Sequence, residues 1–131
     1  ASVTTINTIN TWTAVGNIFT SGNNNGLTIS TNTMVLGAGR GGTYQISANV
    51  TIERVAGSPQ FEVGVSRNSA IPIASAYNGA SVNSTFTTAN IAINFITTLN
   101  ASDDLLIAVR NITGTNNVII KHAQIFATKI N

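Results

Sequence analysis

The chain contains no cysteine and very little charge. Without cysteine it has neither disulfide bonds nor thiolate metal sites. Charged side chains make up 8% of its 131 residues, against about 25% in a typical soluble domain. The six basic and four acidic side chains leave a formal net charge of only +2. The basic residues are also scattered along the chain, so we expect no nucleic-acid partner.

Long apolar runs are also missing. No run approaches the roughly 18 residues that a membrane-spanning helix needs, and no basic segment precedes an apolar one near Ala1. We therefore expect no membrane association. The lack of a signal peptide does not argue against an extracellular or virion location.

Thr, Asn and Ser take the place of the missing charges, with 48 residues in total. Thr is β-branched and fits a pleated sheet, so one interpretation is a simple preference of a β-rich sequence. The other is a surface buried against neighbouring molecules, where desolvating charged groups would be costly.

Turn-forming residues recur at short intervals, and no segment shows a capped apolar period of 3.6 residues. Short strands between regular Gly, Asn and Pro clusters are typical of a β-sandwich or barrel. We expect one domain over residues 1–131. The predicted turns lie at residues 22–26, 37–42, 57–59, 68–72, 78–79, 100–104 and 113–117.

The predicted strands are of two kinds. Residues 61–66 and 91–95 alternate large apolar with polar or small side chains, which indicates strands with one solvated face. Residues 105–109 are continuously apolar, and the closing segment 118–130 carries apolar residues at both parities. Such strands are covered on both faces, most simply by another subunit. The alternative is that long loops of the same chain cover the second face.

Several motifs in the second half of the chain occur in a familiar order. Gly42-Thr43-Tyr44-Gln45-Ile46 opens a strand, residues 61–65 alternate, and Leu99 leads through a polar turn and Asp104 into an apolar strand. The chain closes with an aromatic-bearing strand. Over residues 33–131 this resembles the C1q/TNF-like jelly-roll superfamily, with Ser102 where the family usually has glycine. The first 32 residues fit loosely as opening strands, with Trp12 and Phe19 as core aromatics.

The resemblance implies an all-β, two-sheet antiparallel jelly-roll sandwich that forms a compact homotrimer, with the first and last strands facing the threefold axis. Free-standing domains with a Thr- and Asn-rich surface resemble the decoration and spike proteins on capsids of tailed bacteriophages and other viruses. Our leading hypothesis is a trimeric decoration protein on the virion surface, with a major capsid protein as partner. The candidate trimer interface comprises Ile119, Lys121, His122, Ala123, Ile125 and Phe126.

The alternative hypothesis is a receptor-binding knob or lectin-like module that holds a host glycan or protein. Residues 77–81 read as an exposed loop, so Tyr77 and Asn78 are candidate contacts. Arg40, at the tip of a glycine-rich connection, is a third candidate.

No motif supports catalysis, a cofactor or a metal. Residues 37–42 spell G-x-G-x-x-G, but an alternating strand follows where a dinucleotide site needs a helix. His122 is the only histidine and has no evident nucleophile and carboxylate partners. Asp103-Asp104 lacks the repeated acidic spacing of a calcium loop and reads as a turn. We therefore expect a protein that is not an enzyme.

Overall fold

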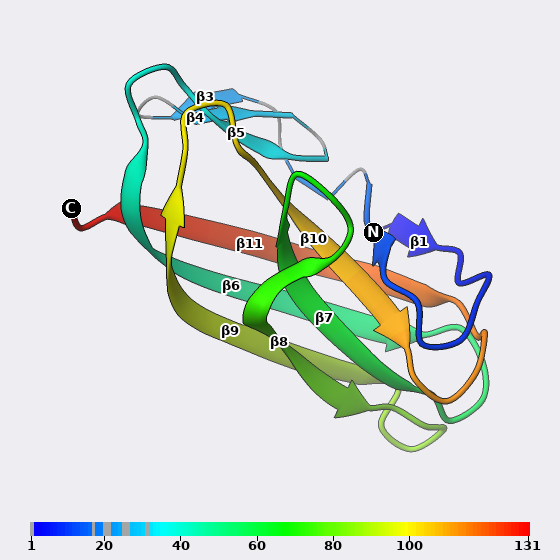
Figure 1. The fold of residues 1–131 in the computed structure, drawn as a ribbon. Coiled ribbons are helices and arrows are strands. Elements are labelled where there is room, and N and C mark those ends of the chain that lie inside the picture. Colours follow the sequence, from blue (N-terminus) through cyan, green and yellow to red (C-terminus); the bar gives the residue numbers. More distant parts are fainter. Residues whose placement is uncertain (1, 17, 20–21, 25–26, 31) are drawn as a thin grey trace.

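The computed structural model describes the whole chain except residues 1, 17, 20–21, 25–26 and 31. The described residues form only strands, arranged in two antiparallel sheets that lie face to face (Figure 1). The four-stranded sheet has the order β1 (Ser2–Thr4), β11 (Val118–Lys129), β6 (Gly42–Arg54) and β9 (Thr88–Leu99).

The second sheet contains seven strands. Its order is β3 (Gly22–Asn24), β4 (Leu27–Ile29), β5 (Met34–Leu36), β10 (Asp104–Asn111), β7 (Gln60–Arg67) and β8 (Pro72–Ser81), while β2 (Thr13–Ala14) also pairs with β10. The prediction of an all-β, two-sheet antiparallel sandwich is therefore confirmed.

The core lies between the two sheets and is built from alternate side chains of the long strands. The four-stranded sheet contributes one set of inward-facing residues: Ile46, Val50, Ile52, Ile91, Ile93 and Ile120. The opposite sheet contributes a facing set: Phe61, Val63, Val65, Leu105, Ile107 and Val109. This alternation follows from the strand period of two. Both predicted strands form, and the solvated second face is confirmed for residues 91–95, where Ala92 and Asn94 are exposed. It is wrong for residues 61–66, where Gly64 and Ser66 are buried.

The continuously apolar strand β10 is buried on both faces, but the second face is covered by the same chain. Leu106 and Ala108 point away from the core cluster and are still buried. In the neighbouring strand, Gly64 stands opposite Ala108, and a side chain at Gly64 would collide with Pro72. Residues 73–76 stand against Val65 alone, so this part of β8 folds over the outer face of the sheet. The inference that β10 needs another subunit to cover it is wrong.

The apolar residues at both parities of β11 have a different cause. The register with β6 shifts between Ile120 and His122, which marks a β-bulge at Lys121. Val118 and Ile120 face inward before the bulge, and Ala123, Ile125 and Ala127 face inward after it. One extra residue therefore moves the inward set from even to odd positions. Most of the two-sided apolar character of this strand comes from that shift.

Three local predictions have mixed outcomes. The glycine-rich segment 37–42 is a connection between β5 and β6, where buried Tyr44 donates its hydroxyl to the Arg40 carbonyl. Residues 77–81 are not a loop: they are the second half of strand β8, so the turn predicted at Asn78-Gly79 is wrong. Trp12 is not a core aromatic, whereas Phe19 packs against the core from its margin.

Candidate functional site

The outer face of the four-stranded sheet is a regular surface built mainly from three long strands, β11, β6 and β9. Because strands β11, β6 and β9 pair in register, their outward side chains form rows across the sheet. One row joins Phe126, Ser47 and Asn94, and another joins Gln124, Asn49 and Ala92. No side chain in these two rows is charged, and four of the six are polar. Ser47 donates to the Asn94 side chain at 2.7 Å, and in the next row Thr51 donates to the Asn90 side chain at 3.3 Å.

This face carries almost no charge. Among the outward residues of β6, β9 and β11, the titratable side chains are Glu53, Lys121 and His122. Glu53 and Lys121 pair with each other at 3.1 Å near one end. Large apolar side chains stand exposed on the same face, with 61% of Val3, 64% of Ile96 and 58% of Phe126 accessible to solvent. Amide, hydroxyl and apolar groups can be desolvated at lower cost than ions, which suits contact with another protein surface.

The predicted interface residues divide between the two faces of β11. Ile119, Lys121, His122 and Phe126 lie on the outward side and share the uncharged face. Ala123 and Ile125 point into the sandwich, and Ile125 is only 9% exposed. Because the bulge at Lys121 turns them inward, these two residues do not lie on the uncharged outer face; both instead line the groove described next.

A groove opens beside the same part of β11. Its volume is about 350 Å³, and its walls are β11 residues 122–126 and the apolar side chains of Ile18, Phe19, Ile29 and Met34. His122 lies at this groove and is exposed.

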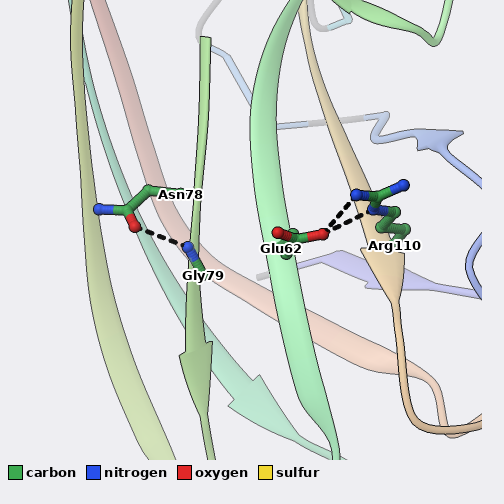
Figure 2. A network of polar contacts seen from close by, with 4 residues as sticks. All are labelled: Glu62, Asn78, Gly79 and Arg110. Atoms are coloured by element: carbon green, nitrogen blue, oxygen red, sulfur yellow. Dashed lines mark hydrogen bonds and ion pairs between the residues drawn. The ribbon is translucent and has the colours of Figure 1, made fainter. Parts of the chain in front are cut away.

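A second surface lies on the outside of the seven-stranded sheet, where Trp12, Tyr77, Arg110 and Glu62 meet. The Arg110 guanidinium lies over the Trp12 ring at 4.6 Å and over the Tyr77 ring at 5.7 Å. The two rings are edge to face, with centroids 5.7 Å apart. Arg110 and Glu62 stand opposite each other on β10 and β7 and pair at 2.6 Å (Figure 2).

The other two predicted contact residues, Asn78 and Arg40, are not part of this cluster. Asn78 accepts the Gly79 backbone N–H at 2.9 Å (Figure 2) and donates to the Ala92 carbonyl of β9 at 3.3 Å. Its side chain therefore links the edges of the two sheets. Arg40 is exposed in the connection between β5 and β6.

Sequence reasoning identified Tyr77 but missed its partners. The available signal was that Glu62 and Arg110 are charged residues within otherwise apolar or small strand segments. Such isolated charges commonly pair across a sheet.

Both oxygens of the buried Asp103 carboxylate accept hydrogen bonds from neighbouring residues. Oδ2 accepts the backbone N–H of Asn100 at 2.7 Å, and Oδ1 accepts the Asn68 side-chain amide at 2.8 Å. Burial alone would raise the pKa of Asp103, but these two hydrogen bonds and the charge of Arg67 hold it below its ordinary value. Within the described ranges, no group of three or more His, Cys, Asp or Glu side chains could hold a metal ion.

No protein-family model matches the chain, and no curated protein sequence matches it either. No helix among the described residues is long and apolar enough to cross a lipid bilayer.

Proposed function

We propose that this chain is a non-enzymatic virion structural protein: a trimeric jelly-roll domain that decorates and stabilises a capsid surface. The observation that carries the proposal is the uncharged outer face of the four-stranded sheet, with Val3, Ile96 and Phe126 exposed on it. The strand orders β1-β11-β6-β9 and β5-β10-β7-β8, with antiparallel pairings throughout, support the jelly-roll assignment.

Burial of this face explains its composition. In a trimer, the first and last strands would turn toward the threefold axis and bury the three exposed apolar side chains against those of neighbouring copies. At about 25 cal/mol per Å² of apolar area, a standard interface of ~800 Å² per partner gives a large gross stabilisation, from which the entropy of association is subtracted. The amide and hydroxyl rows would hydrogen-bond across the contact without the cost of desolvating ions.

The test of assembly is the mass of the protein in solution. We expect a trimer at micromolar concentration by light scattering, and we expect Phe126→Asp to shift it to monomer because the new charge would be buried. Phe86→Asp is the matched control: Phe86 is 69% exposed but lies in the connection between β8 and β9, away from the sheet face. A wild-type monomer under these conditions contradicts the proposal.

The decoration role needs a separate measurement with particles. Capsids that lack the protein are heated or exposed to low salt, with and without added wild-type protein. We expect added protein to raise the temperature at which particles lose their contents, through contact with the major capsid protein. Unchanged particle stability, with the protein bound or unbound, rules out a cement function.

A second candidate function is a receptor-binding or lectin-like module, and the Tyr77 cluster favours it. Aromatic and arginine side chains are the residue types most enriched at the energetic centres of binding surfaces. Loss of host-cell binding on Tyr77→Ala, with the oligomer intact, supports this function over the capsid role.

A further inference from the structure

The aromatic cluster lies beside Glu62 and Gly79 on the outer face of the seven-stranded sheet, and we call the surface between Tyr77, Gly79 and Glu62 the notch. Glu62 of β7 stands directly opposite Gly79 of β8, which carries no side chain, and 19% of the Glu62 side chain is exposed. A Cβ at position 79 would lie 3.2 Å from Cγ of Glu62 and 3.1 Å from the Phe61 carbonyl oxygen. Glycine therefore avoids a tight contact with the stem of Glu62 at this position.

The ion pair leaves half of the Glu62 carboxylate unused by Arg110. Both Nε and Nη2 of Arg110 reach the same oxygen, Oε1, at 2.7 and 2.6 Å. Figure 2 shows the other carboxylate oxygen directed toward the side of Gly79. The floor of the notch thus offers an acceptor oxygen, while the net charge of the pair is zero.

Aromatic rings stand beside this floor. Tyr77 is two residues from Gly79 along β8, so both face the same side of the sheet, and 44% of Tyr77 is exposed. Trp12 precedes β2, which pairs with β10 next to Arg110. Contacts with Arg110 and Tyr77 hold the indole in place.

We propose that this notch is a saccharide-binding site for a neutral pyranose. The exposed Tyr77 ring stacks on the C–H face of the sugar, and the free oxygen of Glu62 accepts hydrogen bonds from its hydroxyls. An aromatic surface beside a few fixed polar groups is the usual composition of a small-molecule site. The inference deepens the second candidate function and is independent of the trimer.

The charges at the notch favour a neutral sugar over an anionic one. Arg110 is already neutralised by Glu62, so a sugar carboxylate or a phosphate would approach a carboxylate oxygen without an unpaired cation to receive it. Asn78 is engaged with Gly79 and Ala92 and shapes the edge of the notch instead of binding ligand.

The experiment uses the fluorescence of Trp12, which is the only tryptophan of the chain. Full-length protein is titrated with the methyl glycosides of glucose, galactose, mannose and N-acetylglucosamine, and with sialic acid as the anionic probe. We expect a saturable change for at least one neutral glycoside, with a Kd in the millimolar range, and none for sialic acid.

Variants assign the response to the notch. We expect Tyr77→Ala and Gly79→Ala each to weaken binding by about tenfold or more, because the first removes the stacking ring and the second crowds and displaces the Glu62 side chain. Tyr77→Phe should retain binding, and Phe86→Ala should behave as wild type. Circular dichroism of each variant excludes a folding defect.

Three results overturn the proposal: no saturable response to any neutral glycoside, binding only of sialic acid, or wild-type binding by folded Tyr77→Ala. Host-cell binding that requires Tyr77 but is not inhibited by these glycosides would sustain a receptor function while rejecting the saccharide. None of these outcomes alters the mass measurement that tests the trimer.

Discussion

Ser102 and Asn68 take the same left-handed backbone conformation, with φ of 71° and 62°, but their side chains differ in what they contribute. The Asn68 side chain makes two hydrogen bonds to the start of β10 and the turn before it. Its amide nitrogen donates to the Asp103 carboxylate, and its amide oxygen accepts the Asp104 backbone N–H at 2.8 Å. Ser102 donates its backbone N–H to the Leu36 carbonyl, and among the described residues its side chain forms no hydrogen bond of the kind that Asn68 makes.

Replacing these two residues by glycine should therefore change stability in opposite directions. Ser102→Gly removes the steric cost of the left-handed conformation and keeps the backbone hydrogen bond, so we expect a gain of about 0.5–1 kcal/mol. Asn68→Gly loses both of these side-chain hydrogen bonds, one of which is made to the buried Asp103 carboxylate. We therefore expect the free energy of unfolding to fall by about 1–2 kcal/mol. Urea unfolding measures both. Equal shifts of the same sign would show that the Asn68 bonds add nothing.

Asp103 predicts a pH dependence at the acid end. Its pKa in the folded protein is lower than the ordinary value of 3.8, so the unfolded chain binds the proton more readily. The stabilisation it gives is complete above the ordinary value and is lost as pH falls through the lower, folded value. We expect Asp103→Asn to be less stable than wild type at pH 7, with a gap that narrows below about pH 4. Urea unfolding from pH 7 to pH 3 measures this gap, and a gap that stays constant contradicts the assignment.

At the scale of the strand, the bulge at Lys121 makes a sharp prediction. Deleting Lys121 removes the extra residue and leaves Val118, Ile120, Ala123, Ile125 and Ala127 on one regular inward face. The deletion costs the exposed Lys121–Glu53 pair, which is worth about 0–1 kcal/mol, so we expect a folded protein of similar stability.

Deleting Gln124 instead is the matched control. It leaves the bulge in place and turns Ile125 and Ala127 outward, because a shift of one residue exchanges the two faces of a strand. We expect a loss of about 2 kcal/mol or more, or no folding. Thermal unfolding of the two deletions compares them. Equal damage would show that the bulge is not what sets the inward face of β11.

The bulge also shows where sequence reasoning reached its limit. Regular alternation at residues 61–66 and 91–95 predicts strands because a single period assigns every side chain to a face. At residues 118–130, the inward side chains are even-numbered before the bulge and odd-numbered after it. Without knowledge of the bulge, this pattern indicates a strand that is apolar on both faces. Likewise, the Asn78-Gly79 pair favours a turn by local preference, but pairing with β7 keeps it in a strand. The pairing with neighbouring strands determines the conformation of both segments, and local sequence patterns do not reveal that pairing.

For the molecule as a whole, composition anticipated the uncharged surface, but only the pairing of β6, β9 and β11 places it on one sheet face. The aromatic cluster could not be assembled from the sequence, because Trp12, Tyr77 and Arg110 come from segments that are far apart along the chain. Glu62 and Arg110 are isolated charges within strand segments, a signal that was available but that does not show what they contact.

The uncharged face predicts how assembly responds to salt. Contacts between charged patches weaken as the Debye length shortens from roughly 10 Å at 0.1 M to 3 Å at 1 M salt. Here Glu53 and Lys121 already neutralise each other, so their burial removes no unpaired fixed charge. We expect the association constant to change less than about twofold between 0.05 and 0.5 M NaCl. Sedimentation equilibrium measures it. A tenfold loss over that range would mean that the copies meet through charged residues elsewhere, and not through the face of β11, β6 and β9.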